Sequence, residues 1–239
     1  MSPDRVTVVV PTYNELENLR DLITSIRAHG YRVLVVDDAS PDGTGELADE
    51  ISRETPGVGV LHRSAKQGLG PAYAAGFETA LDEGAAAVVE MDADFSHDPA
   101  DLPRLIAALE QADLAIGSRY VPGGSTPDWP WLRRFVSRAG NLYARTLLGI
   151  PVRDATAGFR AFKADALRRL PYREAESSGY GFQVEMAWRA HQAGLEIREV
   201  PVVFRDRFRG KSKMGLPIVL EAMMLVTMWG LRRLTGGRP

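Results

Sequence analysis

The stretch VTVVVPTYNELENLRDLITSIRAHGYRVLVVDD (Val6–Asp38) carries the pattern that decides the fold. Its first five residues are apolar or β-branched, which is typical of a buried strand. Leucine and isoleucine then recur at helical spacing after Asn14, which we expect to cap a helix that Gly30 ends. A second apolar run, RVLVVDD, follows directly. The order strand, helix, strand predicts a βαβ unit with parallel strands.

The first half of the chain repeats this unit. Further strands are expected at GVGVLHR, AAAVVEMDAD and DLAIGSRY, separated by helical patterns. The second half is less regular, with a Pro- and Gly-rich loop (122–131), a basic helical stretch, a helix in GFQVEMAWRAHQAG and a strand pair near LEIREVPVVFRDR. No linker or internal repeat divides the chain. We therefore predict one α/β domain over residues 1–239, with a doubly wound, mostly parallel sheet and helices on both faces.

Composition limits the possible classes of protein. The chain has 239 residues, 45% hydrophobic and 25% charged, as is usual for globular proteins. It lacks cysteine, so it has no disulfide and no thiolate site, which fits a reducing compartment. The N-terminal residues contain no long apolar segment, so we expect no signal peptide. A net charge of -2 argues against general affinity for nucleic acid.

The net charge hides an asymmetry between the two halves of the chain. Residues 1–118 carry 8 Lys and Arg against 21 Asp and Glu, whereas residues 119–239 carry 21 against 10. The two halves can simply neutralise each other in the fold. The alternative is a basic surface for an anionic ligand or a membrane.

Polar clusters follow three of the predicted strands. They are PTYNE after the first, DDAS after the second and DADFSH after the fourth. In doubly wound sheets, ligands bind beyond the carboxyl ends of parallel strands, which lie along one edge. We therefore expect the three clusters to form one site rather than three unrelated loops.

Asp92 and Asp94 stand one residue apart after an apolar run. Side chains at positions i and i+2 of an extended segment point to the same side, and two like carboxylates there repel each other unless a cation compensates them. Oxygen ligands suit Mg²⁺ or Mn²⁺, and the phosphates of a nucleotide would complete the coordination shell. The alternative is two solvated aspartates, because an isolated Asp-x-Asp is a weak signal.

Three other features fit a nucleotide ligand. Asp37, at the end of the second strand, can accept from a ribose hydroxyl or a base N–H, although it could also shape the turn that follows. The glycines of KQGLGPAYAAG precede a helix and resemble a phosphate cradle, but a tight turn for close helix packing explains them equally well. The basic run FRDRFRGKSK (204–213) suits a flexible clamp on a diphosphate or a solvated loop.

Taken together, these motifs resemble those of a known family. VVVPTYNE, VVDDASPDGT, GLGPAYAAG, DADFSHDP, GSRY, TAGFRAF, GYGFQVEM and VPVVFRDRFRGKSK look like family 2 of the inverting glycosyltransferases, and more closely like polyprenol-phosphate (dolichol-phosphate) mannose synthases. The resemblance covers nearly the whole chain in motif order. It implies a GT-A fold, a nucleotide-sugar donor (GDP-mannose in the most similar subgroup), Mg²⁺ or Mn²⁺, and a polyprenyl phosphate acceptor.

The resemblance also implies roles for particular residues. Asp92 and Asp94 would hold the metal and the diphosphate, with Ser96 at a position where some members have glutamine, so that water could replace it as a ligand. Arg119 with Arg133 or Arg134 would bind the acceptor phosphate. The residues expected to bind the nucleotide sugar are Pro11, Tyr13, Glu15, Asp37, Lys66, Asp92, Gln183, Glu185, Arg207 and Lys213. Among these, Gln183 and Glu185 would line the sugar pocket, and Arg207 and Lys213 would clamp the diphosphate.

No general base is assigned, because a polyprenyl phosphate with a second pKa of about 6 is already ionised at neutral pH. A transferase that uses another donor, such as UDP-glucose or UDP-GlcNAc, or a hydroxyl acceptor remains an alternative. The hydroxyl reaction would need a base such as Asp154 or Glu185. A nucleotide-binding module without catalysis is a third possibility. The two cationic clusters favour a phosphate acceptor.

The C-terminal stretch 214–234 bears on the lipid. It is apolar but interrupted by Glu221, which leaves too short a run for a bilayer span. We predict a helix that lies on a membrane surface or docks on a small membrane-anchoring subunit, with packing on its own domain as the alternative. The expected location is the cytoplasm, peripherally associated with the cytoplasmic face of the membrane.

Overall fold

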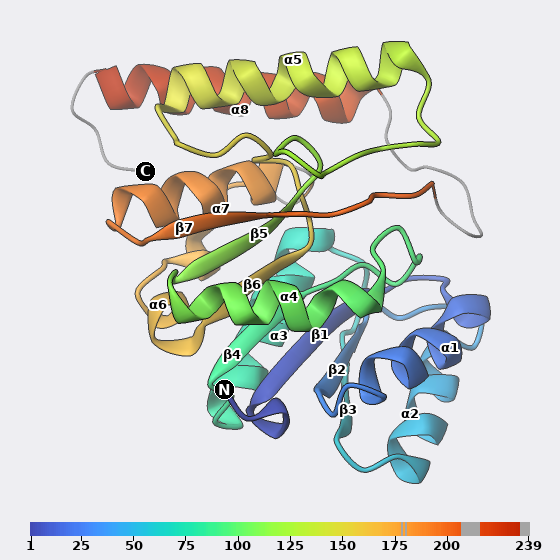
Figure 1. The fold of residues 1–239 in the computed structure, drawn as a ribbon. Coiled ribbons are helices and arrows are strands. Elements are labelled where there is room, and N and C mark those ends of the chain that lie inside the picture. Colours follow the sequence, from blue (N-terminus) through green and yellow to red (C-terminus); the bar gives the residue numbers. More distant parts are fainter. Residues whose placement is uncertain (178, 180, 207–215, 235–239) are drawn as a thin grey trace.

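The computed structural model describes residues 1–177, 179, 181–206 and 216–234. Its centre is a seven-stranded sheet with helices on both faces (Figure 1). The strands are β1 (Val6–Thr12), β2 (Arg32–Asp37), β3 (Val58–His62), β4 (Ala87–Glu90), β5 (Leu114–Ser118), β6 (Arg160–Lys163) and β7 (Ile197–Pro201). The helices are α1 (Leu16–Arg27), α2 (Thr44–Glu54), α3 (Leu69–Asp82), α4 (Leu102–Ala107), α5 (Trp131–Leu148), α6 (Ala164–Arg168), α7 (Gly181–Gln192) and α8 (Leu216–Leu234).

The strand order is β3-β2-β1-β4-β6-β5-β7. β1, β2, β3 and β4 pair in parallel, as does β5 with β7, whereas β6 runs antiparallel to both of its neighbours. The mostly parallel, doubly wound sheet confirms the predicted fold class. The order also places the carboxyl ends of β1, β2 and β4 side by side, so the loops after these strands share one edge.

The apolar strands carry a hydrophobic core on each face. On one face, alternate strand residues such as Val8 and Val10 pack against α1, α2 and α4. On the other, residues such as Val9 pack against α3, α5, α7 and α8, with Phe77 and Trp188 fully buried. The strict alternation along β1 follows from the two-residue period of a strand. With both faces covered, the loops at the strand ends remain available for a ligand.

Two local predictions were wrong, and one strand was missed. Asn14 does not cap α1: it adopts a left-handed backbone (φ 60°), and Glu15 occupies the cap position without a side-chain bond. The segment near LEIREVPVVFRDR contains one strand, β7, followed by an isolated bridge from Val203 to Ser125. The four residues of β6 were too few to show a strand period, so the antiparallel strand was missed.

Two helices form the outermost layer beyond α7. α5 and α8 lie side by side over α7, away from α1 and α2 (Figure 1). Within the described residues, no helix is long and apolar enough to cross a membrane. The predicted helix at 214–234 is present as α8, and its contacts show that it packs on its own domain: Val226 and Trp229 are buried.

Candidate active site

The loops after β1, β2 and β4 each hold one strained residue. Asn14, Ala39 and Phe95 have φ values of 60°, 54° and 58°, and they are the only non-glycine residues with positive φ in the described part of the chain. Neither alanine nor phenylalanine has a polar side chain that would stabilise this conformation. Strain of this kind clusters at functional sites. One strained residue in each of three adjacent loops supports a shared site at this edge.

The loops after β1 and β2 are joined through Asp37. Its carboxylate accepts from Thr12 Oγ1 (3.0 Å), Ser40 N (3.0 Å) and Ser40 Oγ (2.6 Å), and the residue is 2% exposed. The bonds to Ser40 are those of a turn residue, so Asp37 shapes the loop whatever else it binds. Pro11 stands opposite Val36 in the same strand pair.

Tyr13 and Lys66 lie together near this loop. The Lys66 ammonium stands over the Tyr13 ring, 3.9 Å from its centroid. Glu15 follows Tyr13 and accepts from Asn18 Nδ2 (3.2 Å). An aromatic ring beside a cation offers a stacking surface and a positive charge, which are the groups that a nucleotide needs.

The loop after β4 carries the two aspartates. β4 ends at Glu90, so neither aspartate lies in the strand from which we argued their common direction: Asp92 is in irregular backbone and Asp94 is in a turn. Asp92 Oδ1 accepts from Tyr73 OH (3.2 Å), and Asp94 Oδ1 accepts from Ser96 N (3.0 Å). The left-handed Phe95 between Asp94 and Ser96 reverses the chain and permits the second contact.

These residues fit a divalent metal. Ser96 is 1% exposed, and its Oγ has no hydrogen-bond partner within the described part of the chain. A buried oxygen without a partner beside two carboxylates provides the hard ligands that Mg²⁺ and Mn²⁺ bind. Among the described residues, no three acidic or histidine side chains form a complete metal site. A cation here therefore needs further oxygens, from Ser96, water or a diphosphate.

Arg119 is held in a fixed orientation. Its Nε and Nη2 donate to the two oxygens of Asp154 (2.7 and 2.5 Å), and Nη2 also donates to Thr156 Oγ1 (2.7 Å). Asp154 is fully buried, and Arg119 is 8% exposed. The guanidinium is therefore oriented by a bidentate pair before any ligand arrives.

An aromatic cluster connects Arg119 with the metal loop. Phe204 packs edge-on against His97 and against Trp129, at 5.0 and 5.4 Å between ring centroids. Arg119 stands 5.4 Å from the Trp129 ring, and Arg133 stands 3.9 Å from it. His97 is buried, and burial lowers its pKa to about 4, so it is a neutral residue that packs against the rings of Phe159 and Phe204. The loop after β4, which carries Asp92 and Asp94, and the arginines Arg119 and Arg133 thus form one continuous region.

Arg133 and Arg134 lie on the first turn of α5. Arg133 also pairs with Asp206 (2.6 Å), and Arg134 is exposed. Arg119, Arg133 and the loop of Asp94 therefore lie in one region, and the roles predicted for these residues stay predictions. Arg207 and Lys213, the expected diphosphate clamp, lie outside the described residues.

Gln183 and Glu185 do not share a pocket. The Gln183 amide faces the region beside Asp92, near Gly158. Two residues along a helix point in nearly opposite directions. Glu185 accordingly faces away and is fully buried, accepting from Arg189 Nη2 (2.6 Å) and from Ser177 N (3.1 Å). Because this ion pair engages its carboxylate, we correct the expectation that Glu185 lines the sugar pocket.

The glycines before α3 serve packing. A Cβ at Gly70 would stand 2.8 Å from Ser177 O and 2.9 Å from Phe182, which is closer than real Cβ atoms come. Gly68 has a φ of 103°. Close helix contact and a tight turn therefore account for both residues, and the phosphate cradle is not needed to explain them.

Sequence reasoning missed two buried residues under the aspartates. Glu90 ends β4 and stands opposite Arg160 in the antiparallel pair, and both are 0% exposed. Burial raises the pKa of Glu90 to about 7, and the charge of Arg160 opposes the rise. The signal was present in the sequence as a glutamate inside an apolar run, VVEM.

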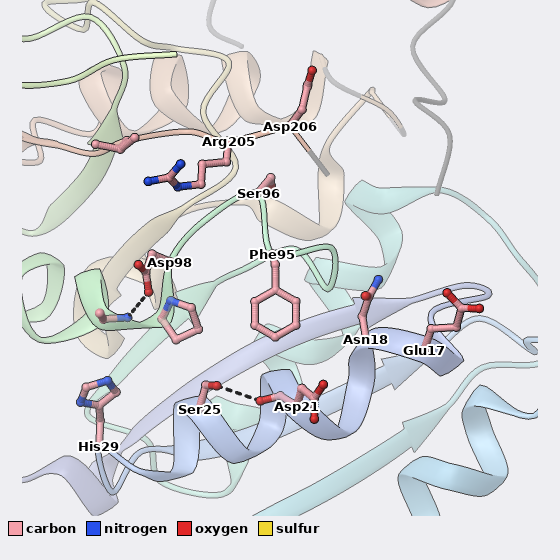
Figure 2. Close-up of a pocket in the computed structure, with 13 residues that line it drawn as sticks. Glu17, Asn18, Asp21, Ser25, His29, Phe95, Ser96, Asp98, Arg205 and Asp206 are labelled. Atoms are coloured by element: carbon pink, nitrogen blue, oxygen red, sulfur yellow. Dashed lines mark hydrogen bonds between the residues drawn. The ribbon is translucent and has the colours of Figure 1, made fainter. Parts of the chain in front are cut away.

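A groove of about 540 Å³ lies between α1 and the loop 95–100, on the other side of the metal loop (Figure 2). Phe95 projects into the middle of the view, with α1 below it and Arg205 above it. The carboxylates that line it are those of Glu17, Asp21, Asp98 and Asp206. Of the proposed metal ligands, Ser96 is among its lining residues, but Asp92 and Asp94 are not, and neither is Asp37. The groove is therefore a poor match for an anionic donor.

The sheet, its three adjacent loops and the paired aspartates define a GT-A type glycosyltransferase fold. The chain belongs to glycosyl transferase family 2, whose model matches residues 7–170. The resemblance of the motifs to this family is thereby confirmed.

Two curated relatives are similar over nearly the full length. An undecaprenyl-phosphate mannosyltransferase from Micrococcus luteus is 52% identical over 229 residues, covering 95% of this chain and 94% of the relative. A polyprenol monophosphomannose synthase from Mycolicibacterium smegmatis is 47% identical, covering 95% and 88%.

A solved structure has the same fold. Glucosyl-3-phosphoglycerate synthase from Mycobacterium tuberculosis, in complex with Mn²⁺, UDP-glucose and glycerol 3-phosphate, matches with a TM-score of 0.63 at 22% identity. The match covers 98% of this chain and 81% of that chain.

Proposed function

We propose that this protein transfers mannose from GDP-mannose to a polyprenyl phosphate, with inversion at the anomeric carbon and with Mg²⁺ or Mn²⁺ bound. The names of the two relatives, a mannosyltransferase acting on undecaprenyl phosphate and a polyprenol monophosphomannose synthase, support the sugar and the lipid. The Mn²⁺ and UDP-glucose in the similar solved structure support the use of a metal and a nucleotide sugar.

One observation carries the choice of acceptor. The two carboxylates that could activate a hydroxyl acceptor, Asp154 and Glu185, are both fully buried and engaged in ion pairs with arginine. A base must reach the proton that it removes. A phosphate acceptor needs no base, because its oxygen is already ionised near pH 7. The site therefore suits a phosphate better than an alcohol.

The donor would lie across the three loops. Tyr13 and Lys66, with Pro11, Glu15 and Asp37, would surround the base and ribose. Asp92, Asp94 and Ser96 would hold the metal, which supplies positive charge against the diphosphate when bound. The fixed carboxylates and the strained loops keep these ligands in place before the donor arrives.

The acceptor would approach from the arginine side. Arg119, oriented by Asp154, would bind the acceptor phosphate with Arg133 or Arg134. A phosphate oxygen then forms a bond to the anomeric carbon of the sugar. The bond from that carbon to the diphosphate oxygen breaks, and its electron pair leaves with GDP. No proton moves in this step, so the residues need only orient two anions and neutralise them.

The outer surface of α5 and α8 would lie on the membrane. Trp131, Leu132 and Phe135 on α5 are 72%, 56% and 63% exposed, and Met224 and Leu231 on α8 are 66% and 60% exposed. Exposed arginines at 134, 138 and 145 flank them. Apolar and cationic side chains on one helix suit an anionic membrane surface. This placement would bring Arg119 and Arg133 near the lipid phosphates.

A panel of labelled nucleotide sugars tests the proposal. The protein is incubated with GDP-mannose, GDP-glucose, UDP-glucose or UDP-GlcNAc, vesicles containing polyprenyl phosphate and Mg²⁺ or Mn²⁺, and lipid is then extracted. We expect label in lipid with GDP-mannose, and none after chelation of the metal. Lipid labelled instead from a UDP-sugar, or undiminished in excess chelator, would overturn the donor or the metal assignment.

A further inference from the structure

The motif GLGPAYAAG (68–76) contains a buried polar side chain that helix packing does not explain. Tyr73 lies on α3 and is 0% exposed. Its ring stacks on Phe77 and on Phe182, with 5.9 and 6.3 Å between ring centroids. A phenylalanine would fill the same stack without bringing a polar group into the core. The hydroxyl of Tyr73 therefore requires a separate explanation.

The partner of this hydroxyl is a carboxylate of the loop after β4. Tyr73 OH donates to Asp92 Oδ1 at 3.2 Å. Tyr73 is held by its helix and by two stacked rings, whereas Asp92 lies in irregular backbone beyond the end of β4. The more rigid side chain thus restrains the less rigid one. The bond orients the Asp92 carboxylate before any ligand arrives.

The two aspartates of the loop are restrained from different parts of the fold. Asp94 Oδ1 accepts from Ser96 N (3.0 Å), a backbone group of the same loop. The bond to Asp92 comes instead from α3. Two carboxylates that share one cation must keep a fixed arrangement, above all for Mg²⁺, which requires near-ideal geometry. The arrangement of Asp92 relative to Asp94 therefore depends on Tyr73.

The close packing at Gly70 supports the same side chain. A Cβ at Gly70 would stand 2.9 Å from Phe182 Cδ2, and Phe182 is one of the two rings that stack on Tyr73. A larger residue at position 70 would displace Phe182 and with it one side of the stack. The contact between α3 and α7 thus helps to place the hydroxyl that reaches Asp92.

We propose that Tyr73 is a positioning residue for the metal site, and that its hydroxyl holds the Asp92 carboxylate in the orientation that binds the divalent cation. This inference rests on the proposed function, which includes Asp92 among the metal ligands. Loss of an outer partner that orients a metal ligand typically weakens metal binding by about 10- to 100-fold. The 3.2 Å bond is longer than the usual O–H···O distance of about 2.7–2.8 Å, so we expect a loss near the lower end of that range.

Nucleotide binding at different metal concentrations measures this role without the transfer reaction. The quantity is the Mn²⁺ concentration that gives half-maximal binding of a fluorescent GDP analogue. We expect it to rise about 10-fold in Tyr73→Phe, which keeps the ring in the stack and loses only the hydroxyl. Tyr172→Phe is the matched control. Tyr172 is also buried and packs edge-on against Phe77 (5.5 Å), but its charged neighbours are Arg173 and Glu78, so the Mn²⁺ concentration should stay within about 2-fold of the wild type.

A double-variant cycle tests whether Tyr73 acts through Asp92. In an Asp92→Asn background, Tyr73→Phe should change the half-maximal Mn²⁺ concentration by less than about 2-fold, because both changes act on one carboxylate. A loss in this background as large as that in the wild-type background would show that Tyr73 affects the site by another route, and the inference would be wrong.

The wild-type measurement keeps the two proposals apart. If the wild type binds the GDP analogue equally well with and without Mn²⁺ or Mg²⁺, the metal of the proposed function is wrong and this inference falls with it. If the wild type requires the metal and Tyr73→Phe has the same half-maximal Mn²⁺ concentration, the proposed function stands and this inference alone is wrong.

Discussion

The loops at the carboxyl edge of the sheet and the helices α5 and α8 differ in what they bury and what they expose. The loops concentrate buried charge, with Asp37 and Asp94 only 2% and 4% exposed, and they hold strained residues at fixed positions. The helices instead leave large apolar side chains in contact with solvent, such as Trp131 at 72%. The loops therefore contain strained backbone at fixed positions, whereas the two helices expose apolar side chains on an open surface.

Under the proposed function, this difference assigns the donor to the loops and the lipid acceptor to the side of α5 and α8. A soluble, highly charged donor requires preorganised ligands, because reorganising them during the reaction would cost part of the rate. A lipid acceptor requires a surface that follows the membrane. Arg119 stands at the junction, fixed by Asp154 on one side and near Trp129 on the other. The predictions below perturb one region at a time.

The largest effect is expected at the metal loop. Asp94→Ala removes a proposed metal ligand, and charge stabilisation by a bound metal is worth several kcal/mol, so transfer should fall about 1000-fold. Mannosyl transfer is measured with the metal and the donor in excess. Leu167→Ala, a fully buried residue of α6, serves as a control for lost stability.

Vesicle flotation gives the second readout for Asp94→Ala. Binding to anionic vesicles should be unchanged, since α5 and α8 are untouched. Transfer within 3-fold of the wild type would contradict the assignment of Asp94.

A smaller effect is expected at the exposed helices. Trp131→Ser with Phe135→Ser removes two aromatic side chains from the proposed membrane surface. Burying one such side chain is worth about 1.5–3 kcal/mol, and partial insertion of two should give about 10- to 100-fold in vesicle affinity.

Flotation with anionic vesicles measures this loss, and Leu16→Ser, on α1 and away from α5, is the matched control. Transfer to a short, water-soluble prenyl phosphate should remain near the wild-type rate. Unchanged flotation would mean that this face meets a partner protein, such as an anchoring subunit, or nothing at all.

A still smaller effect on transfer is expected at Arg119, where the two regions meet. Thr156→Val removes the hydroxyl that accepts from Arg119 Nη2 and from Asn141 Nδ2 while keeping the shape of the side chain. The loss of the bond to Arg119 alone is worth about 0.5–1.5 kcal/mol, so lipid transfer should fall at least about 2- to 12-fold. GDP-mannose affinity by calorimetry should stay within 2-fold. An equal loss of donor affinity would place Arg119 on the donor side.

The smallest effect concerns strain. Ala39→Gly relieves a left-handed backbone, and we expect the free energy of unfolding to rise by up to about 1 kcal/mol. Ala107→Gly, in the exposed part of α4, should lower it by about 1 kcal/mol because helical glycine is unfavourable. Urea denaturation of both variants measures the contrast. A lower stability of Ala39→Gly would show that the loop after β2 is not strained.

The sequence predicted the regular part of the fold well. β1 to β5 stand out because long apolar runs alternate with helical periodicity, and the polar clusters that follow β1, β2 and β4 were placed on one edge. β6 was not predicted, because a strand of four residues that begins with Arg160 shows no alternation of apolar and polar residues. The left-handed Ala39 and Phe95 could not be predicted either, since no residue preference marks them.

The sequence indicated which residues belong to the candidate site, but it did not indicate which of them contact one another. The paired aspartates were found from their type and spacing, whereas Arg119, Arg133 and Arg134 were expected from the family resemblance. The bond of Arg119 to Asp154, 35 residues away, depends on the pairing of β5 with β6 and on the loop before β6, which the sequence did not reveal. For the same reason Asp154 and Glu185 had to stay open as bases until their ion pairs were seen.

The central claim is that the acceptor arrives already ionised, so that the protein needs no base. The most direct measurement presents polyprenyl phosphate and the matching polyprenol alcohol together in the same vesicles, with labelled GDP-mannose and Mn²⁺, and separates the two lipid products. The account predicts label in the phosphate-linked product alone. It also predicts that the folded Glu185→Gln variant, in which the side chain keeps its shape, still transfers mannose to the phosphate. Label in the product of the free alcohol, or transfer abolished in a folded Glu185→Gln protein, would contradict it.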